Sequence, residues 1–133
     1  MKPSSRLYEA LYVSTLAPDQ PLSVVADIAG RARTRNASLG ITGLLIFDGM
    51  RFCQQLEGPQ KEVLKLTERI RNDPRHTGVE VLHHGPLAER RFRQFSLAFT
   101  SVEDTEALVQ LEQFDGQAAM AAFEALRKGL ELE

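Results

Sequence analysis

ITGLLIFDGMRFCQQLEG, residues 41–58, has the pattern of a β-hairpin. An apolar run leads to Asp48-Gly49, a dipeptide that favours a tight turn, and a second strand-like run follows it. Gly58 and Pro59 then interrupt the extended pattern. The other elements are placed by their order relative to this hairpin.

The second strand of the hairpin raises a question about one polar residue. Side chains alternate between the two faces of a strand. One face would carry Phe52, Gln54 and Leu56, and the other Arg51, Cys53 and Gln55. The two apolar neighbours mark the first face as the buried one and the second as pointing away. Gln54 is therefore predicted to point into the core, although a buried amide is costly unless it is hydrogen-bonded.

The flanking sequence completes an α+β fold. The expected order is a strand over 6–14, a helix from 23 to Gly40, the hairpin, a helix from Pro59 to 72–76, and strands over 79–87 and 90–100. This β-α-β-β-α-β-β order resembles the ferredoxin-like split βαβ pattern with one added strand. Right-handed crossovers would place both helices on one face of the sheet, side by side.

A change of composition near Thr100 divides the chain. Residues 101–133 hold eight acidic and two basic side chains, whereas the whole chain has a net charge of −2. We expect a compact domain over 1–100 and a helical extension over 101–133. The extension would form two amphipathic helices that pack on the open sheet face or on a second subunit. Its predicted apolar stripe is Ala118, Ala122, Phe123, Leu126 and Leu130.

Composition excludes several classes of protein. The small net charge gives no case for a nucleic-acid or membrane-surface protein, and a single cysteine, Cys53, excludes an internal disulfide and a cysteine-rich metal site. No apolar run is long enough to span a bilayer, and the first residues lack a signal-peptide pattern. A cytoplasmic location is the expectation.

Three uncharged polar residues lie where the pattern calls for apolar ones: Gln54, Asn36 at the end of the first helical stripe, and Tyr12 on the first strand. They could satisfy one another or cap backbone groups. Because their elements meet near one seam, they could also bind a flat ligand with hydrogen-bonding edges. Ile28 and Ile70 could then cover its two faces, although each could equally be ordinary core.

No familiar catalytic constellation competes with this reading. His76, His83 and His84 lack the spacing of a metal site, and Cys53 has no histidine nearby in the sequence. Glu57 could be a catalytic carboxylate or could bond the turn and helix start. The cluster 73–76 is either a capped, charged loop or a grip on an anionic group, with Arg75 and His76 as donors.

Taken together, five motifs resemble the BLUF domain, a blue-light sensor that uses flavin. They are LYVS at 11–14, N-x-x-x-x-ITGLL from Asn36, F-x-Q-x-LEGP from Phe52, I-x-x-DPRH from Ile70, and RRF at 90–92. Each motif alone is weak, but their order and spacing over residues 6–99 make the set specific.

The resemblance implies a flavin held non-covalently between the two helices over the sheet. Light would drive electron and proton transfer from Tyr12 to the flavin. The amide of Gln54 would then rearrange and shift the absorption to the red. Asn36 would hold the flavin edge, with FAD preferred over FMN or riboflavin. Family contacts to the ring edge, ribityl chain or phosphate fall on Arg35, Arg69, Asp73, Arg75 and His76.

One departure concerns signal exit. The family usually has Trp and, two residues later, Met on its last strand, where this chain has Phe95 and Leu97. Neither can form a side-chain hydrogen bond, so any relay through Phe95 and Leu97 would act by packing. No attached output domain is evident, so we expect no enzymatic activity, a homodimer or higher oligomer, and a separate protein partner. A flavin-dependent or acylphosphatase-like enzyme and a scaffold that has lost flavin are the alternatives.

Overall fold

The computed structural model describes residues 7–92, 98–101 and 105–128. The predicted Phe95 and Leu97 lie outside these residues. The elements are β1 (Leu7–Leu16), α1 (Val24–Leu39), β2 (Thr42–Phe47), β3 (Arg51–Pro59), α2 (Gln60–Arg71), β4 (His76–Pro86), β5 (Ala98–Ser101), α3 (Thr105–Leu111) and α4 (Gly116–Lys128). The predicted β-α-β-β-α-β-β order, followed by two helices, is confirmed.

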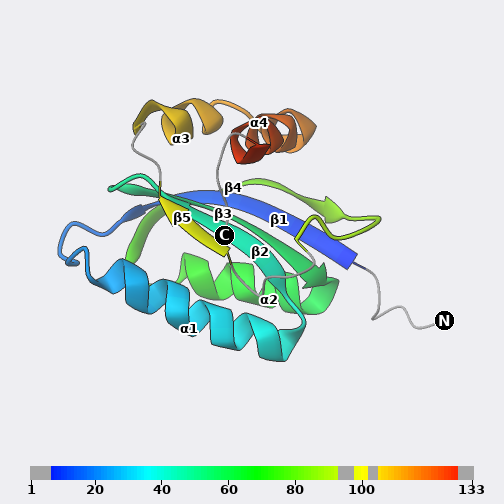
Figure 1. Ribbon diagram of the computed structural model, residues 1–133, viewed down its shortest axis with the longest axis horizontal. Helices are drawn as coiled ribbons and strands as arrows, with labels where there is room; N and C mark the ends of the chain where they lie inside the picture. Colours follow the sequence, from blue (N-terminus) through cyan, green and yellow to red (C-terminus); the bar gives the residue numbers. More distant parts are fainter. Residues whose placement is uncertain (1–6, 93–97, 102–104, 129–133) are drawn as a thin grey trace.

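A five-stranded sheet in the order β4-β1-β3-β2-β5 forms the middle layer. The pairs β1–β3, β1–β4 and β2–β3 are antiparallel, and β2–β5 is parallel. Helices α1 and α2 lie side by side on one face, and α3 and α4 cover the other (Figure 1). The ferredoxin-like prediction and the placement of both first helices on one face are therefore confirmed.

The hairpin turn is built as its sequence predicts. Asp48 Oδ1 accepts hydrogen bonds from the backbone N–H groups of Met50 and Arg51, at 2.9 and 2.6 Å. Gly49 has φ of 101°, a conformation that side chains with a Cβ rarely adopt. β2 and β3 also approach closely at Gly43, where an added Cβ would lie 2.1 Å from the backbone oxygen of Gln55. Gly43 is thus required by the pairing of these strands.

On the first face of the sheet, helical periodicity correctly predicts which residues of α1 and α2 are buried. In α1 the buried residues are Val25, Ile28, Ala29, Ala32 and Asn36, and in α2 they are Val63, Leu66, Thr67 and Ile70. Gly40 ends α1 in the left-handed conformation, with φ of 71°. These stripes place Asn36 against the sheet.

The opposite face corrects two predictions. Cys53 and Gln55 were expected to point away from the core, but both are fully buried because α3 and α4 cover that face. Within α4, Ala118 is exposed, whereas Ala119, Met120 and Phe123 are buried. The extension packs on the open sheet face, one of the two arrangements expected.

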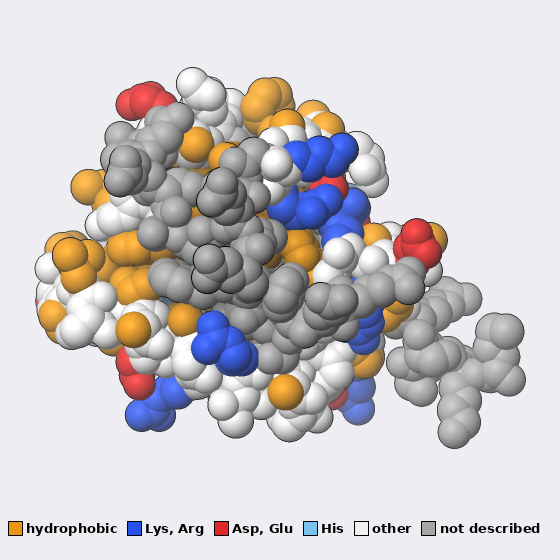
Figure 2. All heavy atoms as spheres, in the orientation of Figure 1, with side chains coloured by type: hydrophobic (Ala, Val, Ile, Leu, Met, Phe, Trp, Pro, Cys, Tyr) orange, Lys and Arg blue, Asp and Glu red, His pale blue; other side chains and the backbone are white. Residues whose placement is uncertain are grey.

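The surface around α4 is charged. Figure 2 shows basic side chains with an acidic one among them beside α4, at the upper right of that view.

Within the described part of the chain, no helix is long and apolar enough to cross a bilayer. No group of acidic, histidine and cysteine side chains among these residues could hold a metal ion.

Candidate functional site

Tyr12 and Gln54 form a buried pair on adjacent strands. They face each other directly in the register of β1 and β3, and the Tyr12 hydroxyl donates a hydrogen bond to Gln54 Oε1. Only 1% of Tyr12 and 4% of Gln54 is exposed. The predicted inward orientation of Gln54 is therefore confirmed. Tyr12, whose face on the strand the sequence pattern left open, also points inward, and each residue supplies the other with a partner.

The Tyr12 phenol is held in its neutral form. Burial raises its pKa well above the usual value of 10, with smaller opposing effects from Cys53, which raises it, and Arg35, which lowers it. A neutral phenol keeps its proton as a donor to Gln54 over the whole physiological range. Tyr12 is thus a permanent hydrogen-bond donor to the amide oxygen of Gln54.

Helix α1 adds Asn36 and Arg35 next to this pair. Asn36 is fully buried, and its backbone oxygen accepts from the N–H of Ile41 at 2.9 Å. Arg35 Nε is buried without a hydrogen-bond partner among the described residues. Burial, followed by the nearby Arg69, lowers the pKa of Arg35. A buried guanidinium nitrogen of this kind requires an acceptor, which a ligand with carbonyl or phosphate oxygens would provide.

A groove of about 800 Å³ runs along α1 to the end of α2. Its size is that of a cofactor site, since such pockets enclose roughly 300–1,000 Å³. Four cations and one carboxylate face it, which suits an anionic ligand. The lining residues are Ala26, Asp27, Gly30, Arg31, Thr34, Arg35, Ser38, Arg69 and Arg75.

The segment 73–76 divides between the groove and the core. Arg75 forms a two-pronged ion pair with Asp73, with a closest distance of 2.7 Å, and reaches Asp27 of α1 at 3.8 Å. Arg75 therefore bridges toward α1 at the groove, as a grip on a ligand would require. His76 points elsewhere: its Nδ1 lies 3.0 Å from Ser14 Oγ, and its ring contacts Phe52.

The apolar residues beneath α1 and α2 form two separate clusters. Ile28 belongs to the α1 cluster with Leu45 and Phe52, and Ile70 belongs to the α2 cluster with Tyr12 and Leu56. The structure does not bring Ile28 and Ile70 into one cluster. A flat ring between the helices would have one of these isoleucines on each side. The four arginines of the groove, with the buried Arg35 Nε that has no partner among the described residues, fit the anionic end of a flavin.

Acidification is predicted to destabilise the fold through His76. Burial lowers its pKa below the usual 6.5, outweighing the opposite effect of Asp73. Between the folded and unfolded pKa values the unfolded chain binds more protons, so the free energy of unfolding falls as pH drops below about 6.5. The pKa of Asp73 is also lowered, chiefly by hydrogen bonds from Arg75, but its stabilisation is lost only in more acidic solution, below its usual 3.8.

Urea denaturation at pH 7 and pH 5 measures this effect. His76→Gln keeps a hydrogen-bonding group opposite Ser14 but cannot titrate. The variant should lose less stability on acidification than the unmodified protein. An equal loss in both proteins would exclude His76 as the source.

Three buried polar residues on the far face of β1 and β3 were not predicted as a group. Glu9, Gln55 and Glu57 are 3%, 0% and 0% exposed. Glu57 is neither placed for catalysis nor bonded to a helix start; its carboxylate accepts from Thr42 Oγ1 and from the N–H groups of Arg91 and Phe92. Gln55 and Glu57 recur on one face of β3, which is a signal in the sequence, whereas Glu9 lies between Leu7 and Leu11 on its face of β1 and gives no such signal.

Comparison with known proteins agrees with this geometry. The family model described as sensors of blue light using FAD matches residues 7–98. The beta subunit of a photoactivated adenylate cyclase from Euglena longa is 38% identical over 88 residues, 66% of this chain and 10% of that protein. The blue light- and temperature-regulated antirepressor BluF of Escherichia coli (strain K12) is 34% identical over 82 residues, 62% of this chain and 20% of that protein. The chain thus spans a small part of these relatives.

Solved structures share the fold. The dark-state structure of BlrB, a BLUF protein, superposes with a TM-score of 0.71 at 32% identity, covering 83% of this chain and 84% of that one. The photo-activated state of BlsA gives a TM-score of 0.69 at 28% identity, covering 80% and 77%. Klebsiella pneumoniae BlrP1 with FMN and cyclic diGMP gives 0.69 at 34% identity, covering 81% of this chain and 30% of that one. The chain therefore belongs to the BLUF family of flavin-binding blue-light sensors.

Proposed function

We propose that this chain is a blue-light photoreceptor in which Tyr12 and Gln54 carry the photochemistry and that it has no catalytic activity of its own. The observation that carries the proposal is the buried hydrogen bond from Tyr12 to Gln54 Oε1 beside the cationic groove. When bound, the flavin supplies the absorption of blue light and accepts an electron. Tyr12 supplies that electron, and its phenol proton moves toward Gln54 Oε1.

Gln54 can adopt a second hydrogen-bonded state after this electron and proton transfer. Its carboxamide has a donor end and an acceptor end, and rotation or tautomerisation exchanges their positions without breaking the chain. The changed hydrogen bonds would shift the absorption to the red. When the electron and the proton return, Tyr12 is restored and no product leaves.

The remaining binding residues are assigned by their position. Asn36 would hold the ring edge, with Ile28 and Ile70 covering the ring. Arg35, Arg69 and Arg75 would bind the anionic end, with Asp73 orienting Arg75 and His76 supporting the sheet side. The cationic groove favours FAD or FMN over riboflavin, and the family description favours FAD.

We propose that the light signal acts through a change of oligomeric state or through a partner protein. Residues 1–100 would be the sensor and 101–133 the extension that carries the signal, with Phe95 and Leu97 as packing contacts on the way. A homo-oligomer and a separate downstream protein in the cytoplasm complete the proposal. The E. coli relative, named an antirepressor, is a precedent for regulation by light through another protein.

An absorption spectrum of the purified, flavin-supplemented protein before and after blue light tests this function. We expect a flavin spectrum that shifts to the red in light and returns in the dark. A bound flavin that only bleaches would favour a flavoenzyme instead, and failure to bind flavin would favour a scaffold. Parallel titrations with FAD, FMN and riboflavin identify the preferred flavin.

A further inference from the structure

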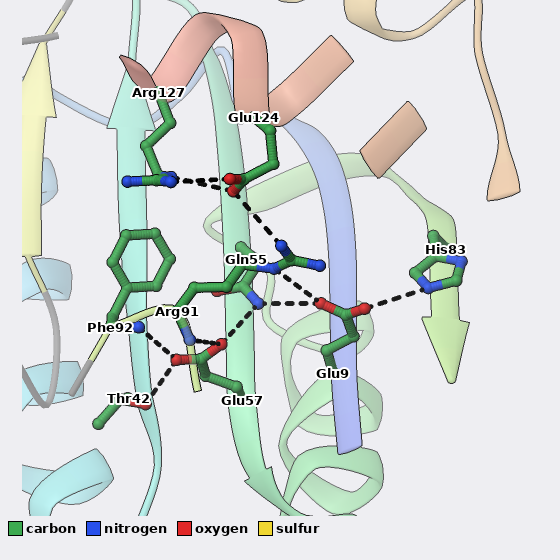
Figure 3. Close-up of polar contacts among 9 residues, drawn as sticks. All are labelled: Glu9, Thr42, Gln55, Glu57, His83, Arg91, Phe92, Glu124 and Arg127. Carbon is green, nitrogen blue, oxygen red and sulfur yellow. Dashed lines mark hydrogen bonds and ion pairs between the residues drawn. The ribbon is translucent and has the colours of Figure 1, made fainter. Parts of the chain in front are cut away.

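The sheet face opposite Tyr12 and Gln54 carries a network of buried and partly exposed charged and amide side chains that reaches α4 (Figure 3). We call it the polar clamp. It consists of Glu9 on β1, Gln55 and Glu57 on β3, Arg91, and Glu124 on α4.

Gln55 occupies the centre of the polar clamp with a fixed amide. Its Nε2 donates to Glu9 Oε1 at 3.3 Å and to Glu57 Oε2 at 3.1 Å. Its Oε1 is buried and accepts no hydrogen bond from the described residues. A flipped amide would turn that oxygen toward two carboxylates, so the amide is held in one orientation. Gln55 therefore connects the two carboxylates and cannot exchange its ends.

Arg91 joins this centre to α4. Its Nε lies 3.3 Å from Glu9 Oε1, and its Nη1 lies 3.7 Å from Glu124 Oε1. Its backbone N–H also donates to Glu57 Oε2 at 3.1 Å. Arg91 thus contacts β1, β3 and α4 at once.

The α4 end of the polar clamp is itself braced. Arg127 donates to both carboxylate oxygens of Glu124, at 2.9 and 2.7 Å, and its guanidinium lies 5.5 Å from the centre of the Phe92 ring. The polar clamp therefore adds a polar attachment to the apolar packing of the α4 side chains that are buried. The buried ones are Ala119, Met120 and Phe123.

The polar clamp and the Tyr12–Gln54 pair share the same two strands. Tyr12 pairs with Gln54, and three positions further along the register, beyond Leu11–Gln55 and Ala10–Leu56, Glu9 pairs with Glu57. Gln55 follows Gln54 directly in β3. A backbone displacement of β3 at Gln54 would therefore move Gln55 against both carboxylates.

We infer that the polar clamp transmits the light signal to α4. In the dark, Arg91 and Glu124 hold α4 on the sheet; after illumination, movement of β3 at Gln54 displaces Gln55, weakens the contacts of Glu9 and Glu57 with Arg91, and loosens α4. The light-dependent part rests on the proposed photoreceptor function. The contacts that run from Gln55 through Glu9 and Arg91 to Glu124 on α4 are observed in the structure and do not depend on that function.

Hydrogen exchange followed by mass spectrometry on the full-length, flavin-loaded protein tests the inference. Peptides covering 116–128 should exchange faster under blue light than in the dark, while the absorption spectrum, recorded on the same samples, reports the red shift. Local opening of a helix changes its exchange rate without global unfolding. The two readings thus separate the photochemistry from its transmission.

Variants of the polar clamp identify the residues that transmit. Arg91→Gln should raise the dark exchange of 116–128 by about tenfold, as loss of a partly buried ion pair implies, and should keep the red shift. Glu124→Gln should do the same, and the double variant should add little beyond either single one. The matched control is Arg71→Gln, which removes a surface ion pair with Glu68 on α2 and should leave the exchange of α4 unchanged.

Gln55→Met separates holding from transmission. The side chain keeps its length but loses both hydrogen bonds, so the red shift should persist while the light-induced change in α4 exchange is lost. A red shift in the unmodified protein without any change in α4 exchange would overturn this inference and leave the photoreceptor function standing. Arg91→Gln and Glu124→Gln proteins whose α4 exchanges as in the unmodified protein would also overturn it. Absence of the red shift itself would refute the photoreceptor function and, with it, the light-dependent step.

Discussion

A Gln54→Leu variant is expected to bind flavin and to show no light-induced red shift. Leucine fits the position because Gln54 is buried beside Phe52 and Leu56 on the same face of β3. It has no donor or acceptor to rearrange, so no second hydrogen-bonded state exists. The expected effect is complete loss of the shift, whereas flavin binding by the groove residues persists.

The cost to stability should be small by comparison. The Tyr12 hydroxyl loses its acceptor, and a buried hydroxyl without a partner costs about 1–3 kcal/mol. Difference absorption spectra before and after blue light, normalised to bound flavin, measure the outcome. Gln55→Met is the matched control, because it changes the neighbouring glutamine on the opposite face. A shift of unmodified size in Gln54→Leu would remove Gln54 from the switch.

Periodicity alone located the first face of the sheet. The helical steps that placed Asn36 with Ile28, and the alternation that placed Gln54 with Phe52, are both observed. These patterns are reliable because each element has one apolar stripe facing one layer. The inward polar residues were visible as interruptions of that stripe.

The opposite face could not be predicted from the same rule. Alternation separates two faces of a strand but does not say whether the second one is covered. Cys53 and Gln55 follow a charged residue, Arg51, and so resemble a solvent-facing set. The distant helices α3 and α4, together with Phe92, make that face a core, and these contacts depend on tertiary structure.

The predicted apolar stripe of α4 is wrong at Ala118, which is exposed, whereas Phe123 is buried and Ala122 and Leu126 pack against the same core. Alanines occupy 118, 119, 121, 122 and 125, so a stripe through 118 and a stripe through 119 are almost equally apolar. A shift of one residue turns a helix by about 100°. Burial of Met120 with Phe123 selects the observed face, because larger side chains gain more from leaving water.

A Tyr12→Phe variant is expected to bind flavin and to lose the normal photocycle. Phenylalanine preserves the ring that packs in the α2 cluster but removes the hydroxyl that donates to Gln54. It also removes the readily oxidised phenol and its transferable proton. Transient absorption should show an excited flavin that decays without forming the red-shifted product.

The few tyrosines and the lack of tryptophan in the sequence limit the number of alternative electron donors. The sequence holds two tyrosines and no tryptophan, so Tyr8 is the one other aromatic side chain that could readily supply an electron. Tyr8 lies four residues earlier on β1, about 13 Å along the strand at 3.3 Å per residue, where it pairs with His84. Tyr8→Phe is therefore the matched control and should retain the full red shift. A full red shift in Tyr12→Phe, with normal yield, would exclude Tyr12 as the donor; its loss in Tyr8→Phe instead would assign that role to Tyr8.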